Sequence, residues 1–252
     1  FFTWIGAIVE IRTKIWNMIG HMGPKMYFLR LSSETKSVED SRKLILEHMN
    51  DKSYDQKLSL IKDQTKSFWE IVKEFANQKD NKIPWDESKD EIIVLDRIVI
   101  IAQVLAKLRA FLQTKDTVGT SGSNYGYEQA IEEDPERASH QMYNLAKGHA
   151  VLFGRNHITQ DDLRVVLDVA LSSASRDRVM LFELLLKSGT LSTSKIMDEL
   201  KTTNDTALRK MKEFEMLGLV EKSKISGTTK PESAINLKKD YHWFLSDEFK
   251  SL

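Results

Sequence analysis

The C-terminal third of the chain is divided by paired helix start and stop signals, and these constrain its fold more than any other feature of the sequence. Ser175 and Ser192 can cap the beginnings of helices, and Gly189 and Gly218 can end them. Apolar residues recur at helical spacing between these signals. The pattern predicts short helices over residues 176–187, 193–200 and 206–217.

Two segments with strand character follow these helices. LVEKSKI alternates apolar and polar residues, SGTTKPES is rich in turn residues, and AINLKKDY begins a second strand. Helices separated by a tight turn form a helix-turn-helix, and an added β-hairpin makes that unit a winged helix. We therefore predict a winged helix over residues 174–252.

Residues 191–222, LSTSKIMDELKTTNDTALRKMKEFEMLGLVEK, resemble the winged-helix DNA-binding domains of prokaryotic regulators. The resemblance implies that the third helix enters the major groove of duplex DNA while the wing approaches phosphate groups. Arginine and asparagine side chains can pair with guanine and adenine edges, which fits this assignment. The DNA-binding residues implied are Asn204, Thr206, Arg209 and Lys210 on the helix and Lys224 and Lys230 on the wing.

The charge balance does not favour tight nonspecific DNA binding. The chain has 37 basic and 37 acidic residues, so attraction to nucleic acid must come from a local patch. On the third predicted helix, Lys210 and Lys212 extend the positive surface, whereas Glu213 and Glu215 oppose it. A winged helix that docks protein and not DNA therefore stays open as an alternative.

The middle of the chain predicts a series of helices. Apolar residues at three- and four-residue spacing indicate helices over residues 37–49, 56–77 and 92–112. Residues 114–127, TKDTVGTSGSNYGY, are rich in glycine, serine and threonine and predict a flexible loop. No GK[ST] follows these glycines, so they do not form a phosphate-binding loop.

Two further helices with a short corner between them are predicted over residues 134–170. Asp134 can cap the first helix. Thr159 can cap the second, and Asp162 three residues later completes a capping box. With the preceding helices, these form a predicted helical bundle over residues 32–173.

Residues 132–168 resemble the helical lid that follows the nucleotide-binding core of AAA+ ATPases, particularly the minichromosome maintenance and MoxR-like groups. The resemblance implies that Arg137 contacts the γ-phosphate of a bound nucleotide. An arginine at a helix start lies where the helix dipole attracts anions, which suits a phosphate contact. An ion pair with Glu133 or Glu136 is the alternative explanation for this arginine.

Residues 1–31 are interpreted as a remnant of the α/β core of such an ATPase. Strands are predicted over residues 1–9 and 26–31, with a helix over residues 13–19 between them. The resemblance implies that Arg30 lies near the place of a subunit-bridging arginine. The polar sensor 1 residue of the family is not evident here.

The sequence has neither a Walker A loop nor an acidic Walker B strand, so we expect no ATPase activity from this chain alone. We predict no catalytic residue and no cofactor within the chain, with ATP bound only if an upstream domain supplies the site. The chain begins at Phe1 and not at methionine, which suggests a cut inside a longer protein. Its first apolar run stops at Glu10, too early for a membrane span, so no membrane partner is expected.

Cysteine and histidine usage predicts no metal site. The chain has no cysteine, which removes thiolate ligands and fits a cytoplasmic location. His140 and His149 lie on opposite sides of their predicted helix, and no HExxH spacing occurs. We expect His149 and His157 to be structural residues.

The C-terminal segment DYHWFLSDEFKSL predicts a short helix that closes the winged domain or pairs with a second copy, and the winged-helix resemblance implies a homo-oligomer. The fold class predicted is mainly α: an α/β remnant (1–31), a helical lid-like bundle (32–173) and a winged helix (174–252). The predicted function is binding of duplex DNA by the C-terminal portion of an AAA+-like ATPase in replication or mobile-element maintenance. The alternatives are a transcriptional regulator with a ligand-sensing or dimerising helical region, and a protein-docking scaffold.

Overall fold

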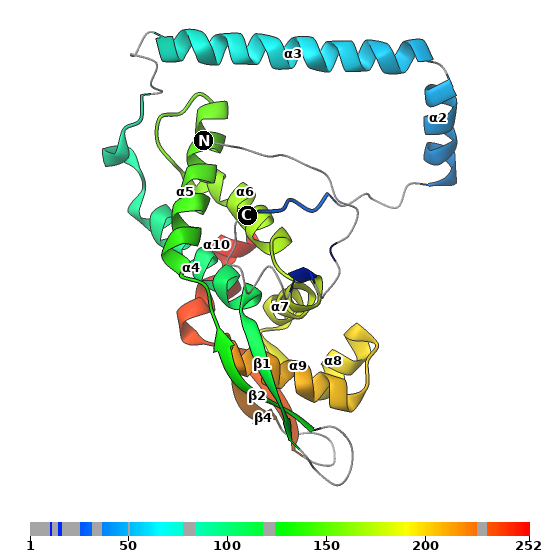
Figure 1. Ribbon diagram of the computed structural model, residues 1–252, viewed down its shortest axis with the longest axis vertical. Coiled ribbons are helices and arrows are strands. Elements are labelled where there is room, and N and C mark those ends of the chain that lie inside the picture. Colours follow the sequence, from blue (N-terminus) through cyan, green and yellow to red (C-terminus); the bar gives the residue numbers. More distant parts are fainter. Residues whose placement is uncertain are drawn as a thin grey trace. The chain divides into compact units, whose positions relative to one another are not determined.

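Helices make up most of the described chain, which confirms the predicted mainly α fold (Figure 1). The chain divides into two compact units, a larger one of residues 1–29 with 90–252 and a smaller one of residues 30–89. None of the helices in the described part of the chain is long and apolar enough to cross a lipid bilayer. The computed structural model describes residues 11, 15–16, 26–31, 37–49, 51–77, 84–117, 124–225 and 231–252.

The smaller unit contains α2 (Val38–Met49), α3 (Asp51–Asn77) and the 3-10 turn η1 (Glu87–Lys89). The two helices contact each other and confirm the helices predicted there. Apolar residues on α3 recur at helical spacing, but Ile61 and Trp69 are more than half exposed. This unit therefore presents an amphipathic helix whose apolar face is largely uncovered by its own residues.

The N-terminal segment of the larger unit lacks the second predicted strand. Ile15 and Trp16 are helical, whereas residues 26–31 have no regular secondary structure, and the strand predicted over residues 1–9 lies outside the described residues. Bundle side chains bond the backbone of this segment. Arg109 Nη2 donates to the carbonyl of Met26 at 2.8 Å, and Phe28 N donates to Ser173 Oγ at 2.8 Å. These side chains take the place of a neighbouring strand.

The bundle of the larger unit consists of α4 (Ile92–Arg109), α5 (Pro135–Leu152) and α6 (Leu163–Ser172), and each of these helices contacts the other two. The corner between α5 and α6 carries the 3-10 turn η2 (Gln160–Asp162). The capping box of Thr159 and Asp162 is confirmed. The core is filled by Ile98, Ile101, Leu105, Met142, Ala146, Leu163 and Val166, all fully buried.

A β-hairpin lies between α4 and α5, where a flexible loop was predicted over residues 114–127. Its strands, β1 (Phe111–Thr117) and β2 (Asn124–Ile131), pair antiparallel. The loop prediction was wrong for residues 114–117 and 124–127, because glycine, serine and threonine content does not reveal that each strand's backbone finds its partner in the other. Residues 118–123 lie outside the described residues. The helix predicted over residues 92–112 likewise ends at Arg109, where β1 is about to begin.

The C-terminal part of the larger unit is a winged helix, as predicted. The short strand β3 (Thr190–Ser192) pairs with β5 (Glu232–Leu237), and β5 pairs with β4 (Val220–Ile225), in an antiparallel sheet of order β3-β5-β4. Helices α8 and α9 are followed by the wing, which is the hairpin of β4 and β5. Its elements are α7 (Arg176–Ser188), β3 (Thr190–Ser192), α8 (Thr193–Leu200), α9 (Asn204–Met216), β4 (Val220–Ile225) and β5 (Glu232–Leu237).

The predicted helix signals lie at the observed ends. Ser192 Oγ accepts a hydrogen bond from Lys195 N at 3.2 Å, and Gly189 and Gly218 have φ of 70° and 67°, in the left-handed region that ends helices. Ser175 is the N-cap residue of α7, but its hydroxyl makes no capping bond. The predicted start of α9 is too late by two residues, because its N-cap is Thr203.

The C-terminal residues close the larger unit. They form η3 (Lys239–Leu245) and α10 (Asp247–Lys250). The rings of Phe244 and Phe182 pack edge to face at 5.4 Å, and Glu248 accepts two hydrogen bonds from Arg97 of α4 at 3.0 and 3.2 Å. Of the two roles predicted for this segment, the structure supports closure, because Trp243 and Phe244 are buried within the same chain.

Candidate nucleic-acid interface

One face of α9 is buried in the winged helix and the opposite face is exposed. Ala207, Met211 and Phe214 are at most 1% exposed, and their three- and four-residue spacing fixes the orientation of the helix. The residues left exposed on α9 are Asn204, Asp205, Leu208, Arg209 and Lys212. We call the part of this surface formed by Leu208, Arg209 and Lys212 the α9 strip.

Two acidic residues border the α9 strip, and both are paired with cations outside the helix. Glu213 Oε1 lies 2.7 Å from Arg178 Nε, and Glu215 forms an ion pair with Lys222 of β4. At 3.6 residues per turn, Arg209 and Lys212 lie between these two carboxylates around the helix. The acidic residues expected to oppose the positive surface are therefore each balanced by another charge.

Arg209 and Lys212 have no ion-pair partner among the residues that the structure describes. Of the described ion pairs in the winged helix, two use acidic residues of α9, and their cations come from α7 and β4. The strip thus keeps two exposed cations, together with the exposed apolar side chain of Leu208. An exposed cation without a fixed partner is available to an anionic ligand.

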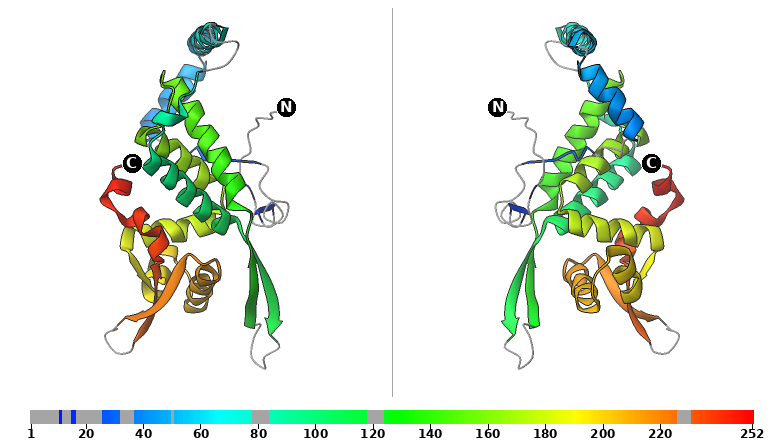
Figure 2. Two further views of the ribbon diagram at one scale, coloured as in Figure 1. Left: turned by 90° about the vertical axis from the view of Figure 1, so that its left-hand side faces the viewer. Right: turned by 90° about the vertical axis from the view of Figure 1, so that its right-hand side faces the viewer.

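The β1–β2 hairpin lies beside α9, on the side of the helix where Glu213 lies. Strand β2 contacts α9, and in Figure 2 this hairpin and the wing project from the same end of the unit with α9 between them. Burial raises the pKa of the Tyr127 hydroxyl above its usual value, and the nearby Glu213 carboxylate adds to the rise. Arg209 and Arg178 lower that pKa, so both guanidinium groups also lie near Tyr127.

Arg178 connects this hairpin to α9. Its Nη1 donates to the carbonyls of Leu108 and Ala110, at 2.9 and 2.7 Å, at the end of α4 just before β1. Its Nε donates to Glu213 of α9 at 2.7 Å. One planar guanidinium therefore fixes the base of the hairpin against the exposed helix.

The structure distributes the predicted DNA-binding residues over several positions. Asn204 and Arg209 are exposed on α9, and Lys224 is exposed on β4. Thr206 and Lys210 are half-buried and lie beyond Glu213, away from the α9 strip. Lys230 lies outside the described residues.

Lys212 belongs to the strip, although sequence reasoning gave it no more than a supporting role. The buried spacing of Ala207, Met211 and Phe214 was readable from the sequence, and the opposite face of that helix contains residues 205, 208, 209 and 212. Lys210 was included among the implied DNA contacts because of the family resemblance. The helical spacing alone would have predicted Lys212, and not Lys210, on the exposed face.

The second predicted site centres on Arg137, in the first turn of α5. Asp134 caps this helix, as predicted, by accepting a hydrogen bond from Glu136 N at 2.9 Å. Arg137 is exposed, and the described residues include no ion pair between it and Glu133 or Glu136. Glu133 lies 3.8 Å from Arg109, and the charge of Arg137 lowers the pKa of Glu133, so an electrostatic interaction with Glu133 stays open as the explanation for Arg137.

A buried polar cluster lies behind Arg137. Arg109 Nε donates to the carbonyl of Ser173 at 2.6 Å, and the guanidinium lies over the ring of Tyr27 at 5.0 Å. Burial raises the pKa of Glu133, whereas Arg109 and Arg137 lower it. Among the described residues, both carboxylate oxygens of Glu133 and the hydroxyl of Tyr27 are buried without a hydrogen-bond partner. Such groups are usually bridged by ordered water.

Arg30, the other residue implied for nucleotide binding, is exposed and belongs to the smaller unit. Arg137 belongs to the larger unit. The two arginines therefore belong to different units of the chain.

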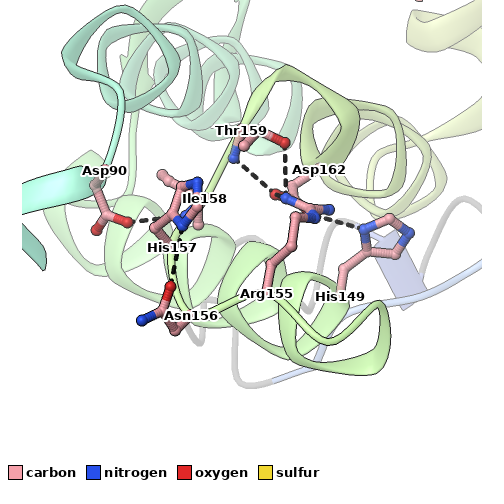
Figure 3. Close-up of polar contacts among 8 residues, drawn as sticks. All are labelled: Asp90, His149, Arg155, Asn156, His157, Ile158, Thr159 and Asp162. Atoms are coloured by element: carbon pink, nitrogen blue, oxygen red, sulfur yellow. Dashed lines mark hydrogen bonds and ion pairs between the residues drawn. The ribbon is translucent and has the colours of Figure 1, made fainter. Parts of the chain in front are cut away.

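The corner between α5 and α6 shows an arginine in a different setting (Figure 3). Arg155 donates from Nη1 and Nη2 to the two carboxylate oxygens of the fully buried Asp162, each at 2.7 Å. His149 Nδ1 lies 2.7 Å from Asp162 Oδ1, and Thr159 N donates to Oδ2 at 2.9 Å. Burial alone would raise the pKa of Asp162, but the hydrogen bonds from Arg155 and His149 outweigh it and lower the pKa.

The remaining contacts of this corner are also structural. Asp90 Oδ1 accepts a hydrogen bond from Ile158 N at 2.9 Å, and its Oδ2 accepts one from Tyr143 at 2.5 Å. His157 Nδ1 lies 3.1 Å from Asn156 Oδ1. Within the described ranges, no group of three or more histidine, cysteine, aspartate or glutamate side chains could hold a metal ion.

Comparisons with known proteins identify no family for this chain. A scan against protein-family models found no match, and a search of curated proteins found none either. Among solved structures, the chain is similar to a transcriptional regulator homologue protein from Pyrococcus horikoshii OT3, with 18% identity and a TM-score of 0.25. The similarity covers 36% of this chain and 92% of that one. A TM-score of this size carries no functional argument.

Proposed function

We propose that this protein binds duplex DNA through the α9 strip, with the wing beside it. The observation that carries the proposal is the pairing of charges around α9. Glu213 and Glu215 are each engaged by a cation from another element, while Arg209 and Lys212 are exposed with no ion-pair partner among the described residues. The exposed surface of the helix therefore has two such cations against one exposed carboxylate, that of Asp205, and so a local positive charge, although the whole chain has none in excess.

The side chains of the α9 strip suit a DNA groove. An arginine can make paired hydrogen bonds with guanine, and a lysine can contact phosphate or a base edge. Leu208 is 41% exposed and offers an apolar contact of the kind that thymine methyl groups accept. Lys224, exposed on β4, is placed to contact phosphate from the wing in this proposal.

The proposal is tested by titrating a fluorescently labelled duplex with the full chain at low salt. Arg209→Gln and Lys212→Gln should each weaken binding about tenfold, because each removes one charge-assisted contact. The matched control is Arg164→Gln, which removes an exposed arginine of α6 whose side chain is 69% accessible. That variant should bind like the wild type.

Two results would contradict the proposal. One is an absence of binding by the wild type at low salt, where phosphate contacts are strongest. The other is equal weakening by all three variants, which would indicate a general charge effect and no role for α9. A protein-docking role of this winged helix, the scaffold alternative, would give the first of these results.

We also propose, as a second function, that Arg137 contacts the phosphates of a nucleotide held by an upstream AAA+-like domain, in a protein of replication or mobile-element maintenance. The specific observation in favour is that Arg137 is exposed at the start of a capped helix while Arg109 takes up Glu133. A helix start favours bound anions. The sequence of the complete reading frame tests this proposal, because it requires GxxxxGK[ST] upstream of Phe1.

If no such motif exists, the regulator alternative remains, with the helical region sensing a ligand or dimerising. The homo-oligomer that the winged-helix resemblance implies stays a prediction. The cytoplasmic location also stays a prediction.

A further inference from the structure

The β1–β2 hairpin has the same relation to α9 as the wing. Both β2 and β4 contact this helix. Tyr127 of β2 lies near Arg209 and Glu213 on one border of the α9 strip, and Lys222 of β4 pairs with Glu215 on the other border. The two views of Figure 2 show the two hairpins on either side of α9, projecting in the same general direction.

A β-bulge aims Tyr127 at α9. Leu112 pairs with Ala130 on the face toward the protein, and the next pair, Gln113 with Gln129, is exposed. Register then shifts, so that Thr114 pairs with Tyr127 and Glu128 is an additional residue on β2. Because side chains alternate along a strand, this one extra residue returns Tyr127 to the face that Leu112 occupies.

The position of the hairpin relative to α9 is fixed at its base. Arg178 binds the carbonyls of Leu108 and Ala110, directly before β1, while its Nε binds Glu213. The base of the hairpin is therefore held beside α9 by the hydrogen bonds of a half-buried guanidinium, each of which contributes to the fold. A fixed element beside the strip restricts what can approach it.

The composition of the hairpin suits contact with a nucleic-acid backbone. Of the polar side chains described on its strands, Gln113 and Gln129 are exposed and Tyr127 is half-buried. These residue types donate hydrogen bonds to phosphate and sugar oxygens in protein–DNA complexes. With 7 and 8 residues, the strands are about 20 to 25 Å long, which is enough to extend well past a helix of about 10 Å diameter.

We infer that the β1–β2 hairpin is a second wing, and that a DNA duplex lies on the α9 strip between the two hairpins. This inference rests on the proposed DNA binding and adds an interaction surface to it. In this arrangement α9 contacts base edges and phosphates of the groove, and the hairpins contact the backbone to either side. Tyr127 helps to position Arg209 between them.

The chain contains no cysteine, so a single introduced cysteine can carry a DNA-cutting iron–EDTA group at one defined place. The test uses the full chain with a labelled duplex of mixed sequence at low salt. Four single variants are compared: Leu208→Cys on the strip, Lys224→Cys on the wing, Gly126→Cys on β2, and Gln141→Cys on α5 as the control. Each is first checked for an unchanged melting temperature, and Gln113→Cys replaces Gly126→Cys if the latter disturbs the fold.

The second-wing arrangement predicts that DNA is cut from position 126 at least half as efficiently as from positions 208 and 224, with background cutting from position 141. Cutting from 208 and 224 but only background from 126 would overturn the inference and leave the proposed DNA binding intact. Background cutting from all four positions would overturn both. Equal cutting from all four would also overturn the inference, because the DNA would then have no defined place on the protein.

Discussion

Two helical segments of the larger unit each present an arginine, and the two arginines have opposite settings. At the α5–α6 corner, Arg155 makes paired hydrogen bonds with the fully buried carboxylate of Asp162. On α9, Arg209 is exposed and has no ion pair among the described residues. Both segments resembled functional motifs in the sequence. The difference shows that the partner of a charged side chain, and not its type, separates a structural arginine from one available to a ligand.

The comparison predicts that the corner supports stability. Asp162→Asn should lower the free energy of unfolding by about 3 to 5 kcal/mol, because it leaves the Arg155 charge without its buried partner. Urea unfolding followed by circular dichroism measures this loss. Asp168→Asn, at an exposed pair with Arg164, is the control and should change stability by less than about 1 kcal/mol. Similar losses in the two variants would show that the buried pair at the corner contributes no more to stability than an exposed pair.

Acidification should also lower the free energy of unfolding, by a smaller and reversible amount, because it protonates Asp162. Because the pKa of Asp162 is lower in the folded protein than in the unfolded chain, its contribution is fully present above about pH 4. The contribution should be lost as pH falls through the lowered pKa. Unfolding measured at several pH values should show the wild type converging with Asp162→Asn in acid. A stability difference that is constant with pH would contradict this account of the carboxylate.

Arg178 is intermediate between the two arginines, since it is half-buried and paired but borders the α9 strip. Arg178→Gln should cost about 2 kcal/mol, because Glu213 and two backbone carbonyls lose their charged donor. It should also weaken DNA binding, through the released Glu213 carboxylate beside Arg209. Unfolding and duplex titration on one preparation separate the two effects, and a loss of stability with unchanged affinity would show that Glu213 has no influence on the strip.

The smallest effect is expected at the start of α9. Thr203 caps this helix, with its hydroxyl accepting from Thr206 N at 3.4 Å. Thr203→Ala should therefore cost about 1 kcal/mol in unfolding free energy, and Thr203→Ser should retain most of the stability. An equal loss in the two variants would indicate that the methyl group and not the hydroxyl supports the helix.

The sequence predicted the winged helix well because its signals are local. Caps such as Ser192 and helix-ending glycines such as Gly218 act within a few residues of their own position, so their effect can be read without tertiary information. The pairing of β1 with β2 depends on a partner strand, and a segment rich in glycine and serine gives little sign of it. The charge balance on α9 was unreadable for the same reason, since Glu213 is engaged by Arg178, 35 residues away.

The central claim is that the exposed cations of α9 contact DNA phosphate and base edges, and the salt dependence of duplex affinity tests it most directly. The logarithm of the affinity should fall linearly with the logarithm of salt concentration. The double variant Arg209→Gln/Lys212→Gln should bind more weakly and lower that slope by about 1 to 2, since each lost phosphate contact removes about 0.9. If the double variant keeps the affinity and slope of the wild type, α9 does not contact DNA and the claim is wrong.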